Sequence, residues 1–199
     1  MFRVAKVTFL LLGVWLFVDC SGNQSKNESS EKPKPVTVPK AGSQEPKVNQ
    51  SLESRNVLNG LVQIKLPSHF EPMPEALLKV KYPSGNAPTE VYSNADGSVN
   101  VALNHTSNQV SKEKLPALLP AFVNQFSKSY PSINWKQKTT TEKGLLLEFE
   151  TPSVDTPIYN FMAVQSLSGK MLMVSFNCPL PLQREWEMKA REIIGSIDY

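Results

Sequence analysis

The stretch Met171–Cys178, which reads MLMVSFNC, decides the fold. Successive side chains of a strand point to opposite faces, so the two methionines lie on one face, while Leu172, Val174 and Phe176 lie on the other. Both faces of this predicted strand are therefore apolar. A strand of this kind is typical of a sheet that is covered on both sides. The chain must then supply cover for two faces.

Six segments upstream have strand patterns that complete the sheet. With the opening stretch, the predicted strands cover residues 61–66, 89–93, 98–105, 133–140, 145–151, 156–166 and 170–177. In the first of them Val62, Ile64 and Leu66 share one face. Between the second and the third, Asp96-Gly97 supplies the positive φ that a tight hairpin turn needs. The last four segments follow one another closely and predict a meander.

Two helices are predicted as cover. The first lies within residues 111–130, with Ser111 as a plausible N-cap. Its apolar stripe consists of Leu115, Leu118, Leu119, Phe122, Phe126 and Tyr130. Pro120 has no N–H group and interrupts the helical hydrogen bonds, so we expect a kink or a late start.

The second predicted helix spans residues 182–194, directly after the opening stretch. Its apolar stripe consists of Leu182, Trp186, Ala190, Ile193 and Ile194. Glu187 and Arg191 are one turn apart on its outer face, as are Glu185 and Lys189. The predicted fold class is α+β: an antiparallel β-sheet with helices packed on its faces.

The N-terminus has the layout of a secretory signal over residues 1–19. Two basic residues precede the apolar run Val7–Val18, whose 12 residues are too few to span a bilayer. Cys20 follows, which predicts a lipoprotein signal with Cys20 as the lipidated residue. The residue before such a cysteine is normally small, and here it is Asp19. Cleavage beyond Cys20 and retention as an uncleaved anchor therefore stay open as alternatives.

Residues 20–55 read as the anchor cysteine followed by a disordered Ser/Pro/Lys linker, and residues 56–199 as a single globular domain. The linker has no aromatic residue and too few apolar ones to fold. From Asn56 onward the chain holds 13 Lys and Arg against 13 Asp and Glu, so the positive net charge comes from the leader and the linker. A neutral domain argues against nucleic acid as a partner.

The sequence offers little that could be catalytic. We find no phosphate-binding glycine loop, metalloprotease motif or nucleophile elbow. Two histidines, His69 and His105, are too few for a metal site by themselves, and no cofactor is predicted. Cys178 lies in an apolar strand and is expected to be a buried, inert residue. We therefore predict that the protein is not an enzyme.

The proline-rich segment 67–88 has two interpretations. In the first it forms a short helix that starts near Pro74 and covers an edge or face of the sheet. In the second it is a semi-rigid rim for binding a partner, with Phe70, Met73 and Tyr82 as the anchoring side chains.

Three motifs together resemble a known family. They are NVLNGLVQIKLP at 56–67, VYSNADGSVNVAL at 91–103, and SGKMLMVSFNCPLP at 168–181 running into a helix that ends AREIIGSI. This order, behind a lipoprotein-type leader and a polar linker, resembles the DcrB-like bacterial envelope lipoproteins of the PsbP/Mog-type fold. The resemblance implies an α/β/α sandwich and a role in binding or assembly, with no catalytic residues to transfer.

The expected function is that of a lipid-anchored protein of the bacterial cell envelope, facing the periplasm, whose domain binds a protein or another envelope ligand. Ser21 stands where an aspartate would signal retention at the inner membrane, which favours the outer membrane. A chaperone- or immunity-type partner of a secreted protein is the first alternative. An enzyme acting on envelope material is the second.

Overall fold

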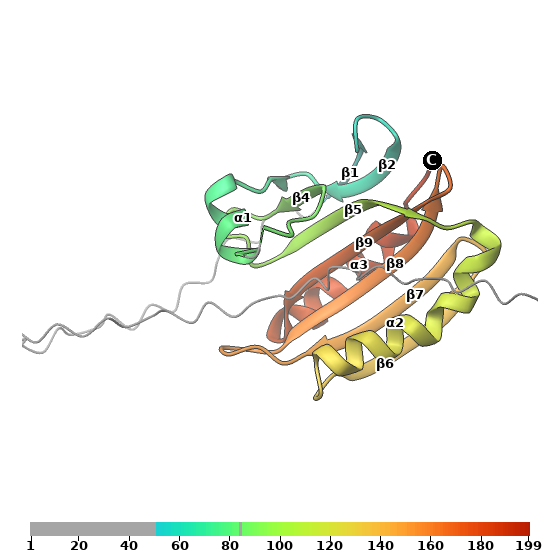
Figure 1. The fold of residues 1–199 in the computed structure, drawn as a ribbon. Coiled ribbons are helices and arrows are strands. Elements are labelled where there is room, and N and C mark those ends of the chain that lie inside the picture. Colours follow the sequence, from blue (N-terminus) through green and yellow to red (C-terminus); the bar gives the residue numbers. More distant parts are fainter. Residues whose placement is uncertain (1–50, 84) are drawn as a thin grey trace, which may run out of the picture.

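The computed structural model describes residues 51–83 and 85–199. Seven strands form one antiparallel sheet in the order β3-β4-β5-β9-β8-β7-β6 (Figure 1). Their bounds are β3 (Glu71–Pro72), β4 (Glu90–Ser93), β5 (Asn100–Gln109), β6 (Asn134–Thr141), β7 (Gly144–Thr151), β8 (Ile158–Leu167) and β9 (Lys170–Pro179). The opening stretch lies in β9, the central strand, and the predicted meander is confirmed as β6 to β9.

The first two strands form a separate two-stranded sheet, β1 (Leu52–Val57) with β2 (Val62–Pro67). The predicted strand at 61–66 is thus confirmed, with its three apolar side chains buried. The predicted linker is wrong for residues 52–55, because these residues belong to β1. Glu53 and Ser54 are exposed and Leu52 and Arg55 are half-buried, so pairing with β2 orders them more than burial does.

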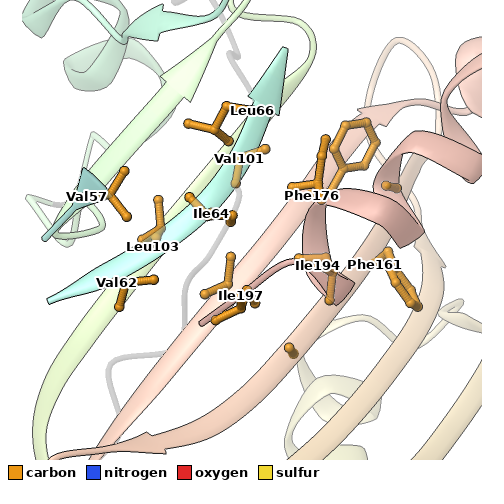
Figure 2. Close-up of a cluster of buried hydrophobic side chains, with 14 of the residues drawn as sticks. Val57, Val62, Ile64, Leu66, Val101, Leu103, Phe161, Phe176, Ile194 and Ile197 are labelled. Carbon is orange, nitrogen blue, oxygen red and sulfur yellow. The ribbon is translucent and has the colours of Figure 1, made fainter. Parts of the chain in front are cut away.

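One face of the sheet is covered by α3 (Gln183–Gly195) together with the β1–β2 hairpin. A 3-10 turn, η2 (Leu180–Leu182), leads from β9 into this helix. Figure 2 shows Ile64 and Leu66 of β2 and Ile194 of α3 gathered over Val101 and Phe176 of the sheet. Four of the five residues of the predicted stripe, Trp186, Ala190, Ile193 and Ile194, are buried in α3, while the fifth, Leu182, lies in η2 and is half-buried.

The other face carries two smaller clusters under two helices. Helix α2 (Leu115–Ser129) follows the 3-10 turn η1 (Lys112–Lys114) and packs on β7 and its neighbours. Helix α1 (Glu75–Lys81) packs on Val91 and Ala102 of β4 and β5. Figure 1 shows α2 in front of the sheet and α3 behind it. The predicted α+β fold with helices on both faces is therefore confirmed.

Two prolines lie in the first half of α2. The α-helix begins at Leu115 rather than at the predicted position 111, and Ser111 lies at the N-cap of η1 instead. Pro116 falls in the first turn, where a missing N–H group costs nothing, and Pro120 lies inside the helix. The α-helix thus begins later than Ser111, but Pro120 is accommodated inside the helix and does not set its start.

Candidate functional site

The three side chains of the predicted binding rim are buried. Phe70 is 0% exposed, and Met73 and Tyr82 are each 5% exposed. Phe70 packs against Trp186 with ring centroids 5.7 Å apart, and Met73 and Tyr82 belong to the cluster under α1. This corrects the rim interpretation, because buried anchors cannot contact a partner in this conformation. The other interpretation holds: a helix begins right after Pro74 and covers the sheet.

Cys20, Asp19 and the signal segment lie outside the described residues, as does the linker up to residue 50. Among residues 51–83 and 85–199, no helix is both long and apolar enough to cross a bilayer.

A row of polar side chains crosses the face of the sheet that carries α1 and α2. Antiparallel register places Ser93 of β4 beside Asn100 of β5, Asn100 beside Asn177 of β9, and Asn177 beside Asn160 of β8. We call these four residues the polar row. Each is at most 3% exposed. Four polar side chains in one buried line are unusual at the centre of a sheet, where apolar side chains are the rule.

Hydrogen bonds join one end of the polar row into a network. Nδ2 of Asn177 donates to Oδ1 of Asn160 over 2.6 Å. Nδ2 of Asn160 in turn donates to Oγ1 of Thr151 at 3.2 Å and to the carbonyl of Ile158 at 2.9 Å. The hydroxyl of Ser175 donates to Oδ1 of Asn177 at 3.3 Å. This half of the row finds its hydrogen-bond partners within its own strands.

The other half of the row is incomplete. Oδ1 of Asn100 is buried and has no hydrogen-bond partner among the described residues. A buried acceptor without a donor costs about 1–3 kcal/mol of stability. One end of the row lies beside the cluster under α1, because Ser93 is two residues from Val91 on β4. The other end lies beside the cluster under α2, because Asn160 pairs with Phe149 of β7. Among the described residues, Oε1 of Gln165 and Nδ1 of His69 are also buried without a partner, but Oδ1 of Asn100 is the one that belongs to the polar row.

A charged cluster ties α3 to the face of the sheet that it covers, which is the face opposite the polar row. Nη2 of Arg191 donates to Glu148 at 2.7 Å and to Glu187 at 3.1 Å, and the hydroxyl of Tyr159 donates to Glu148 at 3.0 Å. Burial, and then the neighbouring Glu148 carboxylate, raise the pKa of the Tyr159 phenol. Tyr159 therefore stays protonated and donates to the Glu148 carboxylate. The predicted Glu187–Arg191 pair is confirmed, as one part of a larger network.

Lys81, at the end of α1, binds the β4–β5 hairpin. Its Nζ donates to the carbonyl of Gly97 at 2.5 Å. Burial lowers the pKa of Lys81 to about 8, against the opposing effect of Asp96. Gly97 has φ +73°, and a Cβ there would lie 3.4 Å from Leu77. The hairpin turn and α1 are thus fitted closely to each other.

The remaining reactive side chains are poorly placed for catalysis. Cys178 is 0% exposed, as predicted, and burial raises the pKa of its thiol to about 12, so it is not a nucleophile at neutral pH. Burial, Arg55 and Lys189 together lower the pKa of His69. His105 lies on β5 with Nε2 3.3 Å from the carbonyl of Leu167. Within the described part of the chain, no three metal-ligating side chains are grouped.

The polar row was not predicted from the sequence, although a signal for it exists. Asn100, Asn160 and Asn177 each occupy a position within or beside an apolar strand pattern, where asparagine is disfavoured. What a single sequence cannot supply is the register between strands. Only pairing across β5, β9 and β8 shows that the three asparagines form one line.

Comparison with known proteins identifies the fold and not the family. No family model matches the chain, and no curated protein matches its sequence. The cyanobacterial PsbP (CyanoP) of Synechocystis sp. PCC 6803 is similar in structure, with a TM-score of 0.52, 10% identity and coverage of 79% of this chain and 97% of that one. The Ran-binding protein Mog1p of Saccharomyces cerevisiae has a TM-score of 0.44 and 12% identity, covering 75% of this chain and 95% of that one. LpqN, involved in cell envelope biogenesis of Mycobacterium tuberculosis, has a TM-score of 0.42 and 12% identity, covering 68% and 81%. The predicted PsbP-type fold is confirmed; at such identities, similarity extends to fold alone.

Proposed function

We propose that this protein is a lipid-anchored accessory protein of the bacterial cell envelope, of the DcrB-like kind, whose domain binds a partner and catalyses no reaction. In this proposal residues 1–19 are a signal, Cys20 is the lipidated residue, and the chain up to residue 50 tethers a domain that begins at Ser51. The domain faces the periplasm, and the outer membrane is favoured.

The anchor rests on the sequence around Cys20. An apolar run too short to span a bilayer ends beside the cysteine, and a polar segment without aromatic residues follows. The chain has only one other cysteine, Cys178, and it is buried in β9. Cys20 is therefore free for acylation, and two acyl chains suffice for stable membrane attachment.

The binding role rests on one observation, the unsatisfied Oδ1 of Asn100 in the polar row. Folded proteins pair nearly all buried polar groups, so an orphaned acceptor needs an explanation. A partner that donates a hydrogen bond to Asn100 supplies one, and because Asn100 is only 1% exposed, such a partner reaches it only after the side chains that cover the polar row move aside. The row itself is uncharged, which suits neutral donors such as the backbone amides of a protein or the hydroxyls of an envelope glycan.

Photo-crosslinking in cells tests the binding face. Glu71 lies opposite Ser93 in register and is exposed, and Asp155 is exposed in the loop after Thr151. A photo-reactive residue at either position should give a discrete crosslinked product. The matched control is Met188, which is 77% exposed on α3, on the opposite face. Equal crosslinking at Met188, or none at Glu71 and Asp155, would argue against this face.

Metabolic labelling with palmitate tests the anchor separately. The protein should incorporate the label, and Cys20→Ala should abolish it, whereas Cys178→Ala should leave it unchanged. A labelled Cys20→Ala variant, or an unlabelled parent protein, would exclude lipidation at this residue.

A further inference from the structure

The charges of the domain are unevenly distributed along the chain. Residues 111–144, which include η1, α2 and β6, hold six lysines and two glutamates. The rest of the chain from Asn56 onward holds seven cationic and eleven acidic residues. A domain with no net charge therefore has one distinctly basic part, which the overall composition conceals.

Four of these six lysines lie around α2 and form what we call the basic face: Lys112, Lys114, Lys128 and Lys138. All four are exposed. Lys138 lies over the ring of Trp135, 5.5 Å from its centroid, and Trp135 belongs to the cluster under α2. The other two lysines are engaged elsewhere, Lys136 with Glu150 at 3.0 Å and Lys143 with the carbonyl of Ile197 at 3.0 Å.

Acidic groups do little to offset the basic face. Helix α2 contains no acidic residue, and Glu113 in η1 is the one acid between Lys112 and Lys114. Hydrogen bonds to its own backbone and to Ser111 lower the pKa of Glu113, so it is ionised at neutral pH. The basic face then carries a net charge of +3, counting its four lysines and this one glutamate.

Helix α2 also packs more shallowly than α3. Leu115 is its one fully buried residue, whereas α3 buries four. Five large apolar side chains of α2 stay partly accessible at the margins of the helix: Leu118, Leu119, Phe122, Val123 and Phe126. Its outermost stripe is small or polar and includes Pro116, Ala117, Pro120, Ala121 and Lys128. Lysines over a shallow apolar margin suit an interface between charged headgroups and acyl chains.

We infer that the basic face docks on the anionic phospholipid surface of the membrane, an inference that rests on the lipid anchor proposed above. The chain between Cys20 and Ser51 can reach at most roughly 110 Å, which limits how far the domain can move from the bilayer. Tethering raises the effective concentration of the surface, and each lysine near an anionic bilayer strengthens attachment about five-fold. Since α2 and the polar row share one face of the sheet, docking brings the row next to the membrane surface.

Hydrogen exchange on vesicles tests the docking with the full, acylated chain. The protein is reconstituted in vesicles of phosphatidylcholine alone or of phosphatidylcholine and phosphatidylglycerol at 70:30. Flotation shows attachment, and mass spectrometry of peptides reports exchange. We expect exchange in Lys112–Ser129 to slow several-fold on the anionic vesicles only, with α3 unchanged. High salt should remove the effect, because ions screen exposed charges.

Matched variants separate the basic face from charge in general. The triple variant Lys112→Gln, Lys114→Gln, Lys128→Gln should lose the protection of α2. The control triple Lys79→Gln, Lys170→Gln, Arg184→Gln removes three exposed cations elsewhere and should retain it. Both triples alter only exposed side chains, so both are expected to fold.

The outcomes distinguish docking from the anchor. Flotation with both vesicles and protection on the anionic ones alone supports both proposals. Flotation only with anionic vesicles supports docking and overturns the anchor. Flotation with both vesicles and equal exchange in α2 overturns docking and leaves the anchor intact. Failure to float with either vesicle overturns both.

Discussion

Arg191 of α3 donates from Nη2 to Oε2 of Glu148 on β7 across 2.7 Å. The carboxylate side chain is only 6% exposed, whereas the guanidinium side chain is 38% exposed. A buried carboxylate is stable only when it is paired, so Arg191 and the hydroxyl of Tyr159 together account for its position. This contact fixes the last helix to a strand more than forty residues away in sequence, and it fixes the layer that opposes the candidate binding face.

Removing the guanidinium should destabilise the fold more than its surface position suggests. Arg191→Ala leaves Glu148 with one donor, Tyr159, in a buried environment. Loss of one partner of a buried pair costs about 3 kcal/mol or more, and partial exposure of Arg191 places this case at the lower end. Urea unfolding measures the loss. Arg184→Ala, which removes an exposed arginine of the same helix, should change stability by less than about 0.5 kcal/mol.

Trp186 lies at the centre of the contact between α3 and the sheet. Its ring lies 5.7 Å from the rings of both Phe70 and Phe176, and the residue is 5% exposed. Trp186→Ala should lower the free energy of unfolding by about 3–5 kcal/mol, because it leaves a cavity between three packed elements. Met188→Ala, on the exposed side of the same helix, is the control. An unchanged urea midpoint for Trp186→Ala would mean that α3 is not docked as described.

Lys81 should make stability rise with pH. Its pKa is about 8 in the folded protein and near 10.5 in the unfolded chain, so the unfolded state binds more protons between these values. The free energy of unfolding therefore gains roughly 2 kcal/mol from this group between pH 8 and 10. Buried tyrosines and Cys178 oppose this gain, since their raised pKa values favour unfolding at high pH. The measurement is consequently the difference between the parent protein and Lys81→Met. That difference should change by about 2 kcal/mol over this pH range, and a constant difference would contradict the burial of Lys81.

The folded part of the chain should require β1. Arg55 donates to the carbonyls of Phe70 at 2.5 Å and Ser68 at 2.8 Å, and it lies in β1. A protein that begins at Ser51 should melt cooperatively. One that begins at Asn56 loses Arg55 and most of the ladder with β2, and should melt at a lower temperature. Identical melting of the two would restore the boundary at Asn56 that composition predicts.

Local patterns predicted most of the fold. Apolar alternation located β2 and β4 to β9, and the stripe of α3 predicted the burial of Trp186, because these features depend only on the spacing of neighbouring residues. Strand β1 was missed, since its polar sequence is ordered by pairing with β2 and not by an apolar face of its own. The sequence also does not show that β1 and β2 form a separate sheet.

The candidate site was less predictable than the fold. One of the two interpretations of segment 67–88 made Phe70, Met73 and Tyr82 anchors for a partner, but aromatic and methionine side chains are as suited to a core as to an interface. The polar row depends on the register between β5, β9 and β8, which no local pattern contains. Arg191 was assigned its helical neighbour Glu187 correctly, while its partner across the sheet, Glu148, required the packing of α3.

Substitution should cost much more stability in one half of the polar row than in the other. Asn160→Ala removes the acceptor of Asn177 and a donor to Thr151, and should cost about 2–3 kcal/mol. Asn100→Leu removes the unsatisfied acceptor and should change stability by no more than about 1 kcal/mol. Thermal unfolding of the two variants measures the contrast. Equal losses would mean that Oδ1 of Asn100 is satisfied within the domain.

The most direct test of the proposed binding face combines the last variant with crosslinking. The yield of the crosslinked partner is measured in cells with the photo-reactive residue at Glu71, in the parent protein and in Asn100→Leu. We expect Asn100→Leu to fold as well as the parent protein. If Asn100 receives a hydrogen bond from the partner, the variant should give much less of the crosslinked product than the parent. An undiminished yield from a folded Asn100→Leu protein would contradict a binding site at the polar row.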